Sequence, residues 1–496
     1  MRSLKKLFLL FTLMLALASG ANAQQERTTR ALLVACSDFV TQEDLGAAIS
    51  GNLHMVGSAL ISADIGLGNL SIEDGTIGAA ETLGVAIADA FSQADEDDLS
   101  ILYLCTHGVL SSSDDGQVYL LLGDGQTESP LSAAALYDLI RGIQGEKLLI
   151  LDACYSGALI GRGQPTPPPA VPAENPALLS PFLMDASVHV LTSSAGHESS
   201  WYYDSEGLSS GAVSYFASAL SSGLGLYGSA EADLNGDGAV SLSELHRHLS
   251  IAVPSSSSQL LSARADSLYL PVASSAMLSR PLTGFSYSTS LLRAGDPTLD
   301  FSFTVARNAT SVQYRLVDFT DGRWDWDNAR TFLDEGDDGS ALLSSGRKQR
   351  SLSLENVMPD EGGYLMLQVF SVHENEVLLC SERLIAMQPS EAECELSILI
   401  PGKLHNPGNL ELPIAVRLGV PAELTVSVYS QEGALVRRLA SSQLTRPSAD
   451  NLTRFYWDGR DMQGNPVAPG SYTIAAETRI GRERLKATTE VTVSVP

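Results

Sequence analysis

The segment Lys147-Leu-Leu-Ile-Leu-Asp152-Ala-Cys154-Tyr-Ser-Gly157 joins a run of apolar residues to a short polar motif. The apolar run has the length and composition of a buried β-strand. In open α/β sheets, reactive groups gather at the carboxyl ends of the strands. The segment therefore predicts a core strand that delivers Asp152 and Cys154 to the end of the sheet where a site would form.

A second segment of the same kind lies upstream, where an apolar run at residues 99–105 is followed by Thr106-His107-Gly108. If the two strands are neighbours, His107 and Cys154 face one another across a single cleft. A cysteine thiol has a pKa near ~8.5 and becomes a strong nucleophile only when a neighbouring group takes its proton. The pair therefore predicts Cys154 as a nucleophile and His107 as its general base.

Short apolar runs alternate with helix-like periodicity from about residue 28 to 275, an order typical of an α/β fold. Because the expected strands are almost continuously apolar, we expect a mostly parallel sheet with helices covering both faces. The expected strands are residues 31–36, 99–105, 147–152 and 188–192, the expected helices are residues 53–63, 77–91, 132–143 and 212–220, and residues 118–122 are expected to form a hairpin arm.

The pattern changes in the C-terminal half, where apolar and polar residues alternate with period two, as they do from Phe301 to Val305. Such strands, separated by turn-rich segments, predict two all-β sandwich modules of the Ig-like kind. We place these modules at residues 278–390 and 391–496. The preceding residues 24–275 are expected to form a single α/β domain.

The N-terminus has the pattern of an export signal. Three basic residues precede an apolar run at residues 7–18, and Ala21-Asn-Ala23 supplies the small-x-small site that a signal peptidase reads. We expect residues 1–23 to be a cleaved signal peptide and the mature chain to be secreted, periplasmic or at the cell surface. No later stretch reaches the ~18 apolar residues of a membrane helix, so no membrane span is expected in the mature chain.

The charge balance bears on partners. The chain has 31 basic and 58 acidic residues, which gives a net charge of −27. A nucleic-acid partner is not expected, because phosphate backbones need a basic surface. The acidic balance agrees with basic substrates and equally with simple solubility.

The two polar motifs together resemble the His-Gly and Asp-x-Cys-x-Ser-Gly signatures of metacaspases and related caspase-fold peptidases. The histidine lies 47 residues before the cysteine, close to the ~50 described for caspases. Caspases carry Gln-Ala-Cys-x-Gly, whereas this chain has Asp152 in place of the glutamine and Ser156 before Gly157. The resemblance covers about residues 28 to 250 and points to the metacaspase branch.

The resemblance implies a cysteine endopeptidase that needs no cofactor for its chemistry and acts on protein or peptide substrates. Cys154 would be the nucleophile and His107 the general base, and the N–H groups of Gly108 and Cys154 would form the oxyanion hole. Asp152 matches the position of an acidic residue in the metacaspase S1 pocket, which implies cleavage after Arg or Lys. The alternative is that Asp152 caps a helix that begins near Cys154.

Two acidic residues and a second histidine lie near these motifs in the sequence. Asp114 and Asp115 follow His107 and would add acidity, but no motif fixes them. His197 follows the strand at residues 188–192 and ranks below His107, because no His-Gly pair or matching spacing supports it. The rival function is a catalytically silent caspase-fold protein that acts as a surface binding module through its β modules.

A proline-rich loop at residues 161–181 interrupts the α/β domain. Proline at this density excludes helix and central strand. In the family that the chain resembles, self-cleavage occurs after the nucleophile, and Arg162 would be a suitable P1 residue. A plain surface insertion explains the loop equally well.

Residues 233–244 match the twelve-residue EF-hand loop at each key position. Oxygen ligands would come from side chains, from a carbonyl at the seventh position and from a glutamate at the twelfth, which suits Ca²⁺. The segment before the loop is glycine-rich, so we expect a lone EF-hand-like loop, with an acidic turn as the alternative. The expected ligands are Asp233, Asn235, Asp237, Ala239 through its carbonyl, Ser241 and Glu244.

The last module carries Trp457-Asp-Gly-Arg-Asp461, followed by Gly464, Val467, Gly470 and Tyr472. This pattern resembles the signature of FlgD-like immunoglobulin-type modules, which commonly end exported bacterial proteins. We expect Trp457 to be in the core and the module to be structural or surface-related. The chain has five cysteines, an odd number that leaves at least one thiol free, and pairing of Cys380 with Cys394 stays open.

Overall fold

The computed structural model describes residues 27–494 except 64, 112–116, 162–179, 204–212, 274–279, 307–309, 327, 337–338, 340, 356, 358–361, 374–375, 390–393, 403, 406–411, 449 and 464. The expected signal peptide, Asp114, Asp115, Arg162, Gly464 and most of the proline-rich loop lie outside the described residues.

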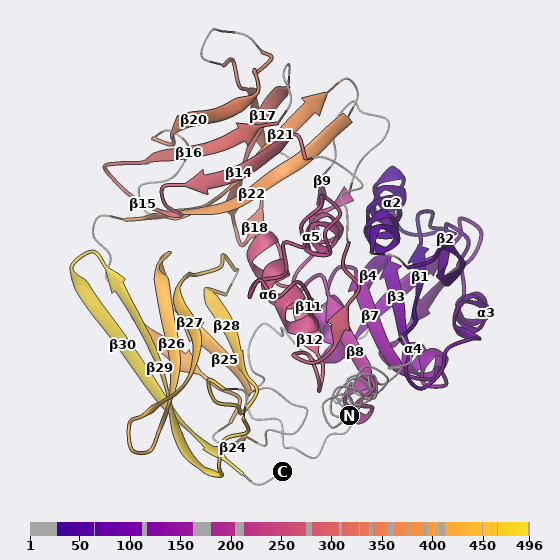
Figure 1. Ribbon diagram of the computed structural model, residues 1–496. Coiled ribbons are helices and arrows are strands. Elements are labelled where there is room, and N and C mark those ends of the chain that lie inside the picture. Colours follow the sequence, from indigo (N-terminus) through magenta and orange to yellow (C-terminus); the bar gives the residue numbers. More distant parts are fainter. Residues whose placement is uncertain are drawn as a thin grey trace, which may run out of the picture.

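A six-stranded sheet forms the centre of the N-terminal part (Figure 1), in the order β12-β8-β7-β3-β1-β2. Neighbouring strands pair in parallel, except that β12 runs antiparallel to β8. The strands are β1 (Thr29–Ala35), β2 (Leu70–Asp74), β3 (Leu99–Cys105), β7 (Glu146–Asp152), β8 (Val188–Thr192) and β12 (Gln259–Leu261). The prediction of a mostly parallel sheet is confirmed.

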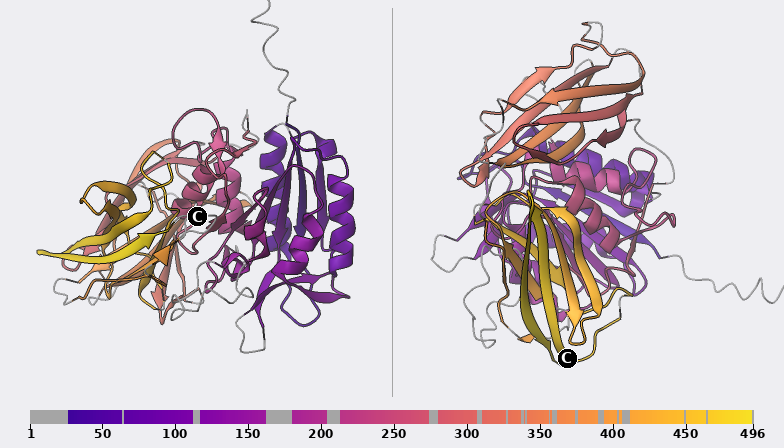
Figure 2. Two further views of the ribbon diagram at one scale, coloured as in Figure 1. Left: turned by 90° about the horizontal axis from the view of Figure 1, so that it is seen from below. Right: turned by 90° about the vertical axis from the view of Figure 1, so that its left-hand side faces the viewer.

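Helices cover both faces of this sheet (Figure 2). On one face, α2 (Ala47–Ser62), α5 (Tyr215–Gly223) and α6 (Leu242–Ala252) pack on residues such as Leu33 and Ile101. On the other face, α3 (Ala80–Phe91) and α4 (Ala133–Ile140) pack on alternate strand residues such as Leu104 and Leu151. Both faces of each strand are therefore buried, which explains the continuous apolar runs.

Strand β2 was missed in the sequence because it lies at the sheet edge. Its sequence Leu-Ser-Ile-Glu-Asp is only partly buried, and Ile72 is 50% exposed. The shorter elements around the sheet include 3₁₀ helices and three small sheets. They are η1 (Leu67–Asn69), η2 (Ser156–Ile160), η4 (Pro181–Met184), β4 (His107–Leu110), β5 (Val118–Gly123), β6 (Glu128–Leu131), β9 (Tyr202–Tyr203), β10 (Val213–Ser214), β11 (Val240–Ser241) and β13 (Tyr269–Leu270).

The first β module consists of two mainly antiparallel sheets, with the orders β14-β16-β20 and β15-β22-β21-β17-β18, and β19 pairs with β17. Inward-facing residues such as Phe303 and Leu367 fill the core between the sheets. The strands are β14 (Leu282–Tyr287), β15 (Leu291–Arg293), β16 (Thr298–Val305), β17 (Ser311–Thr320), β18 (Arg323–Trp324), β19 (Arg330–Leu333), β20 (Gly346–Ser353), β21 (Gly363–His373) and β22 (Glu376–Gln388).

The second β module also has two sheets, in the orders β23-β25-β28 and β24-β30-β29-β26-β27. Trp457 is fully buried in its core and donates its indole N–H to the carbonyl of Arg460 at 3.0 Å. The strands are β23 (Ser397–Leu399), β24 (Leu404–His405), β25 (Leu412–Arg417), β26 (Glu423–Ser430), β27 (Leu435–Leu444), β28 (Leu452–Trp457), β29 (Gly470–Ile480) and β30 (Glu483–Val493). The expected core position of Trp457 is confirmed.

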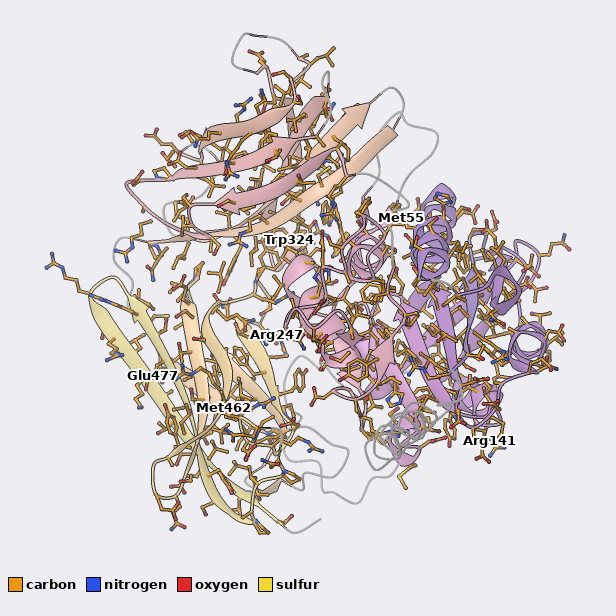
Figure 3. All side chains as sticks on the ribbon, viewed as in Figure 1. Met55, Arg141, Arg247, Trp324, Met462 and Glu477 are labelled. Carbon is orange, nitrogen blue, oxygen red and sulfur yellow. The ribbon has the colours of Figure 1, made fainter. Side chains whose placement is uncertain are left out.

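The β modules pack against the α/β part through α5 and α6, which lie between them and the sheet (Figure 1). Side chains fill this junction, with Trp324 and Arg247 labelled near it (Figure 3). Arg446 of the second module donates to the carbonyls of Ser256, at 2.8 Å, and Val253, at 3.2 Å, just beyond the end of α6. The three parts therefore share a polar as well as an apolar interface.

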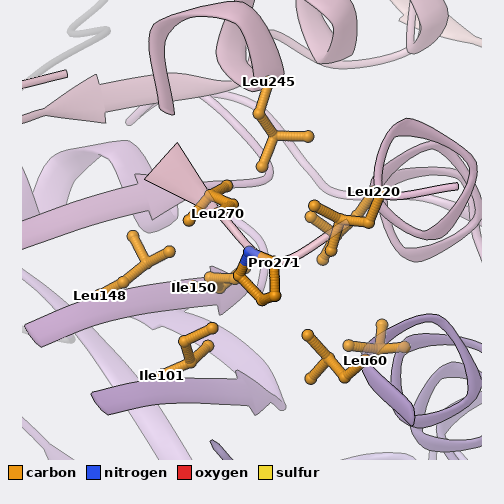
Figure 4. A pocket seen from close by; sticks show the side chains of 10 residues that line it. Leu60, Ile101, Leu148, Ile150, Leu220, Leu245, Leu270 and Pro271 are labelled. Carbon is orange, nitrogen blue, oxygen red and sulfur yellow. The ribbon is translucent and has the colours of Figure 1, made fainter. Parts of the chain in front are cut away.

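A small cavity lies between the sheet and helices α2, α5 and α6 (Figure 4). Its lining is apolar throughout and includes Leu60, Leu148, Leu245 and Pro271. Because no polar group there could orient a ligand, we interpret it as a packing defect of the core. The site of interest lies elsewhere.

All five cysteines are free thiols. Pairing of Cys380 with Cys394 is therefore wrong, because Cys380 is buried in the core of the first β module whereas Cys394 packs against that of the second. Among the described residues, no helix is both long enough and apolar enough to cross a membrane.

Candidate active site

Strands β3 and β7 are neighbours and place the two motifs at the same level. Cys105 pairs in register with Asp152, so His107 and Cys154 each lie two residues beyond a paired position. The N–H of Thr106 also donates to the carbonyl of Asp152 at 3.2 Å. The predicted adjacency of the two strand ends is confirmed.

Gly108 brings the two motifs into direct contact. A Cβ atom at this position would lie 1.7 Å from the carbonyl oxygen of Cys154, so no larger residue fits. The glycine therefore allows the backbone after His107 to lie against the backbone of the candidate nucleophile.

The ring of His107 is held in one orientation. Its Nε2 atom lies 2.8 Å from the carbonyl oxygen of Glu43, and the ring of Phe39 packs on it with a centroid distance of 4.7 Å. A carbonyl can only accept a hydrogen bond, so Nε2 carries a proton. In the neutral imidazole, Nδ1 is then the basic nitrogen.

Cys154 is half-buried, and its thiol lies 3.7 Å from the carbonyl oxygen of Ser200. Burial raises the pKa of the Cys154 thiol, the largest effect on it. The thiol is therefore protonated at neutral pH and needs a base to become a nucleophile. The next residue, Tyr155, has a left-handed backbone with φ of 59° and donates its N–H to the carbonyl of Glu198 at 2.8 Å.

The Asp152 carboxylate is 3% exposed and accepts hydrogen bonds from four neutral side chains. Burial raises its pKa, whereas the hydroxyl donors act in the opposite direction. The donors are Ser214 at 2.5 Å, Tyr103 at 2.9 Å, Ser200 at 3.1 Å and Asn52 at 3.4 Å.

The alternative that Asp152 caps a helix is wrong. The segment after Cys154 is the 3₁₀ helix η2, whose N-terminal flanking residue is Tyr155, and no side chain caps it. The oxygens of Asp152 are instead used by the four donors. A buried carboxylate with neutral donors and no helix to cap is the kind of group that can recognise a cation.

The loop after β8 completes the surroundings of Cys154. A Cβ atom on Gly157 would lie 2.8 Å from the carbonyl oxygen of Ser194, so glycine is required there too. The hydroxyl of Ser193 accepts the N–H of Ala153 at 3.1 Å. His197 lies in this loop with its Nε2 atom 3.7 Å from a carboxylate oxygen of Glu198.

Several residues of the site were not identified in the sequence. Tyr103 and Asn52 are polar positions within apolar surroundings, on β3 and α2, and this could have marked them. Ser200 and Ser214 lie on separate segments with no motif. The contribution of Glu43 is a backbone carbonyl, for which the side-chain sequence gives no signal.

The candidate calcium loop is a tight turn held by its own side chains. The carboxylate of Asp233 accepts the N–H groups of Gly236, Asp237 and Gly238 at 2.8 to 3.1 Å. Gly236 and Gly238 have positive φ of 76° and 86°. Among the described residues, no group of three or more His, Cys, Asp and Glu side chains is arranged to hold a metal, so Asn, Ser and carbonyl oxygens would be needed as well.

The end of the loop has features that fit a cation. Val240 pairs with Leu270 across β11 and β13, and Ser241 caps α6. One oxygen of Glu244 accepts the N–H and hydroxyl of Ser241 at 3.0 and 2.8 Å. The other, Oε1, is buried and has no hydrogen-bond partner among the residues that the structure describes. An unsatisfied buried carboxylate oxygen at the twelfth position is what a Ca²⁺ ligand would supply.

Two family models match parts of the chain. Residues 5–199 match the CHAT domain, which belongs to the caspase-like clan, and residues 408–481 match the FlgD Ig-like domain. No curated protein matches the chain significantly. The first β module lies outside both matched segments.

Two solved structures are distantly similar. Caspase-1 from Spodoptera frugiperda has 14% identity and a TM-score of 0.33, and the match covers 51% of this chain and 93% of that one. The periplasmic chaperone SfaE has 11% identity and a TM-score of 0.22, over 43% of this chain and 100% of that one. The chain thus combines an α/β domain, part of which matches the CHAT family model, with β modules, one of which matches the FlgD Ig-like family model.

Proposed function

We propose that this protein is a cysteine endopeptidase of the metacaspase type that hydrolyses peptide bonds after Arg or Lys. The observation that carries the proposal is the buried carboxylate of Asp152, held by neutral donors two residues before Cys154. A buried charge without a counter-ion is unfavourable. A guanidinium or ammonium group of a substrate would supply the missing charge.

In the first half of the reaction, His107 Nδ1 accepts the proton of the Cys154 thiol, and the sulfur attacks the scissile carbonyl carbon. The oxyanion that forms would be bound by the N–H groups of Gly108 and Cys154, whose backbones lie against each other. His107 then gives its proton to the leaving amine as the C–N bond breaks. The products are a thioester on Cys154 and a new amino terminus.

In the second half, a water molecule gives a proton to His107 as its oxygen attacks the thioester carbon. The C–S bond breaks, the product leaves as a carboxylic acid that ionises in solvent, and His107 returns its proton to the Cys154 sulfur. The Glu43 carbonyl supports both halves, because it holds the Nε2–H tautomer and stabilises the protonated imidazole. The enzyme therefore returns to its starting state without a cofactor.

A fluorogenic assay with matched peptides tests this function. The peptides differ only at P1, which is Arg, Lys, Gln or Asp. The P1-Arg and P1-Lys peptides should be cleaved far faster than the P1-Gln and P1-Asp peptides. Cys154→Ala should abolish the cleavage. Absence of Cys154-dependent hydrolysis, with and without added CaCl₂, would exclude the enzyme and favour the silent binding protein.

We further propose that residues 233–244 bind Ca²⁺. Asp233, Asn235, Asp237, Ser241 and Glu244 would hold it together with the carbonyl of Ala239, and the buried Oε1 of Glu244 supports this assignment. Calorimetric titration with CaCl₂ should show one site, and Glu244→Gln should weaken it by about tenfold or more. Equal heats for the wild type and the variant would contradict the proposal.

Export and self-processing are also proposals. They rest on the basic and apolar N-terminus and on Arg162 within the proline-rich loop. N-terminal sequencing of the protein purified from its host's extracellular and envelope fractions tests both. A chain that begins near Gln24 would support export, and a fragment that begins after Arg162 only when Cys154 is intact would support self-cleavage. A chain that keeps Met1 would refute export. A loop that stays uncut in active protein would refute self-cleavage.

A further inference from the structure

Two of the four donors to Asp152 are each followed directly by an aromatic residue. Ser200 precedes Trp201, and Ser214 precedes Tyr215, which begins α5. The two aromatic residues are linked to each other, since the N–H of Tyr215 donates to the carbonyl of Trp201 at 3.1 Å. The positions of the two serine hydroxyls therefore depend on where these aromatic residues are held.

A tryptophan of the first β module contacts both. Trp326, between β18 and β19, has its ring centroid 5.1 Å from that of Trp201, with an interplanar angle of 44°. It also stacks on Tyr215, with a centroid distance of 5.8 Å and an angle of 23°. One side chain from outside the α/β part thus packs against both segments that carry the serine donors.

A second contact from the same module reinforces the arrangement. Gln368 on β21 is fully buried and donates to the hydroxyl of Tyr215 and, at 2.7 Å, to a carboxylate oxygen of Glu382. Tyr215 is itself 3% exposed. The ring of Tyr215 is therefore fixed at its hydroxyl by a hydrogen bond and at its face by Trp326.

We propose that Trp326 is a positioning residue for the P1 pocket, so that the first β module completes the specificity site of the α/β domain. Trp326 acts through Trp201 and Tyr215 on Ser200 and Ser214, and through these on the carboxylate of Asp152. The pocket needs such support because Ser200 and Ser214 lie on separate segments. This inference takes the identity of the P1 cation from the proposed function. The contact between the Ser200 carbonyl and the Cys154 thiol does not depend on that function.

The expected effect of losing the ring is on substrate binding. Trp326→Ala should raise KM for the P1-Arg peptide by about tenfold, as the loss of two aromatic contacts predicts, while kcat changes by less than about threefold. Trp326→Phe should keep KM near the wild-type value. The phenylalanine also loses no hydrogen bond to the described part of the chain, where the buried indole N–H of Trp326 has no partner.

Phe285→Ala is the matched control. Phe285 belongs to the same β module, but it stacks on Tyr287 and Phe303 within that module. The variant Phe285→Ala should lower the melting temperature and leave KM for the P1-Arg peptide unchanged. A wild-type KM in Trp326→Ala, or an equal rise in Phe285→Ala, would overturn the proposal. If Trp326→Ala does not fold, Trp326→Leu, which keeps bulk without the ring, is judged by the same criteria.

A second readout separates failure of this inference from failure of the proposed function. The carbonyl of Ser200 lies against the Cys154 thiol, so displacement of this segment should raise the rate at which iodoacetamide alkylates Cys154, measured on the tryptic peptide by mass spectrometry. If the wild type cleaves no peptide, the proposed function fails and this rate alone decides. A several-fold rise in Trp326→Ala, absent in Trp326→Phe and Phe285→Ala, would support positioning, and an unchanged rate would refute it.

Discussion

Strand β7 carries a carboxylate at each end, and the two are balanced in different ways. Glu146 at its start forms an ion pair with Arg264 and, at 2.9 Å, a hydrogen bond with His189 on the neighbouring strand β8. Asp152 at its end is more deeply buried, yet its four donors are neutral. The charge of Glu146 is compensated within the chain, whereas the four donors to Asp152 carry no charge, which is the basis of its proposed role in binding a substrate cation. The same strand therefore has a charge-compensated carboxylate at one end and, at the other, the carboxylate proposed to recognise substrate.

One histidine also lies near each end of β7, His189 near the start and His107 near the end. Their surroundings differ, and so do the roles that they can have. His189 is fully buried, and burial lowers its pKa to about 4, so the ring is neutral at pH 7. It bonds to Glu146 through Nε2 and to Ser262 through Nδ1 at 2.7 Å, which occupies both nitrogens. His107 is partly exposed, and one of its nitrogens is held by the Glu43 carbonyl. A histidine with both nitrogens occupied supports the fold, and one with a basic nitrogen to spare can move a proton.

The largest effect is expected when the two histidines are compared by mutation. His107→Ala should lower kcat for the P1-Arg peptide by about 10⁴-fold or more, as loss of a catalytic base does in a nucleophile–base pair, and should leave the melting temperature close to wild type. His189→Ala should do the opposite and lower stability while the folded protein keeps its kcat. Equal losses of activity in the two folded variants would contradict the different roles assigned to His107 and His189.

The next effect concerns the two carboxylates. Asp152→Asn should lower kcat/KM for P1-Arg and P1-Lys peptides by roughly 100-fold, as expected when one partner of a buried ion pair is lost. It should not lower stability, because burial disfavours the charge of Asp152 in the free protein. Chemical denaturation and peptide kinetics on the same samples measure both quantities.

Glu146→Gln is the control for this prediction. It removes the charge that Arg264 compensates, so it should lower the free energy of unfolding by about 1–3 kcal/mol and leave kcat/KM unchanged. A large loss of kcat/KM in Glu146→Gln, or wild-type kinetics in Asp152→Asn, would contradict the division between the two ends.

The sequence could predict the strands that are buried on both faces of the sheet. The strands at residues 99–105 and 188–192 lie where the apolar runs place them, because helices cover both faces of the sheet. Strand β2 could not be predicted in this way, since its edge position leaves polar residues in it. Periodicity reports how a segment is buried, and it fails where burial is partial.

In the candidate site, only the residues that belong to a local sequence motif could be predicted. His107, Gly108, Asp152 and Cys154 follow two neighbouring strands, so their sequence context was sufficient. Ser200 and Ser214 approach Asp152 from separate segments, and Trp326 approaches from another part of the chain. Contacts between residues so far apart leave no local pattern, and only the folded chain brings them together.

A further effect is expected on how the free energy of unfolding depends on pH, through His189. Its folded pKa of about 4 lies below its ordinary value of 6.5, so the unfolded chain binds more protons between these values. The stability contributed by neutral His189 is therefore fully present above pH 6.5 and is lost as the pH falls toward 4, by up to about 3 kcal/mol. Urea denaturation across this range should show the loss, and His189→Gln should reduce it. A pH dependence identical in both proteins would contradict this assignment.

The smallest effect is expected from a single donor at the recognition end. Tyr103→Phe removes one hydrogen bond of 2.9 Å to Asp152 and leaves three. KM for the P1-Arg peptide should rise by about three- to tenfold, in line with the value of a hydrogen bond to a charged group, with kcat little changed. The same substitution should not affect KM if Asp152 takes no part in binding substrate.

The most direct test of the central claim is covalent labelling with two chloromethyl ketone peptides that differ only in P1, one with Arg and one with Asp. The account predicts one adduct on Cys154 with the Arg reagent, little or none with the Asp reagent, and loss of this preference in Asp152→Asn. Labelling of Cys154 by both reagents at equal rates, or an Arg adduct on another residue, would contradict it.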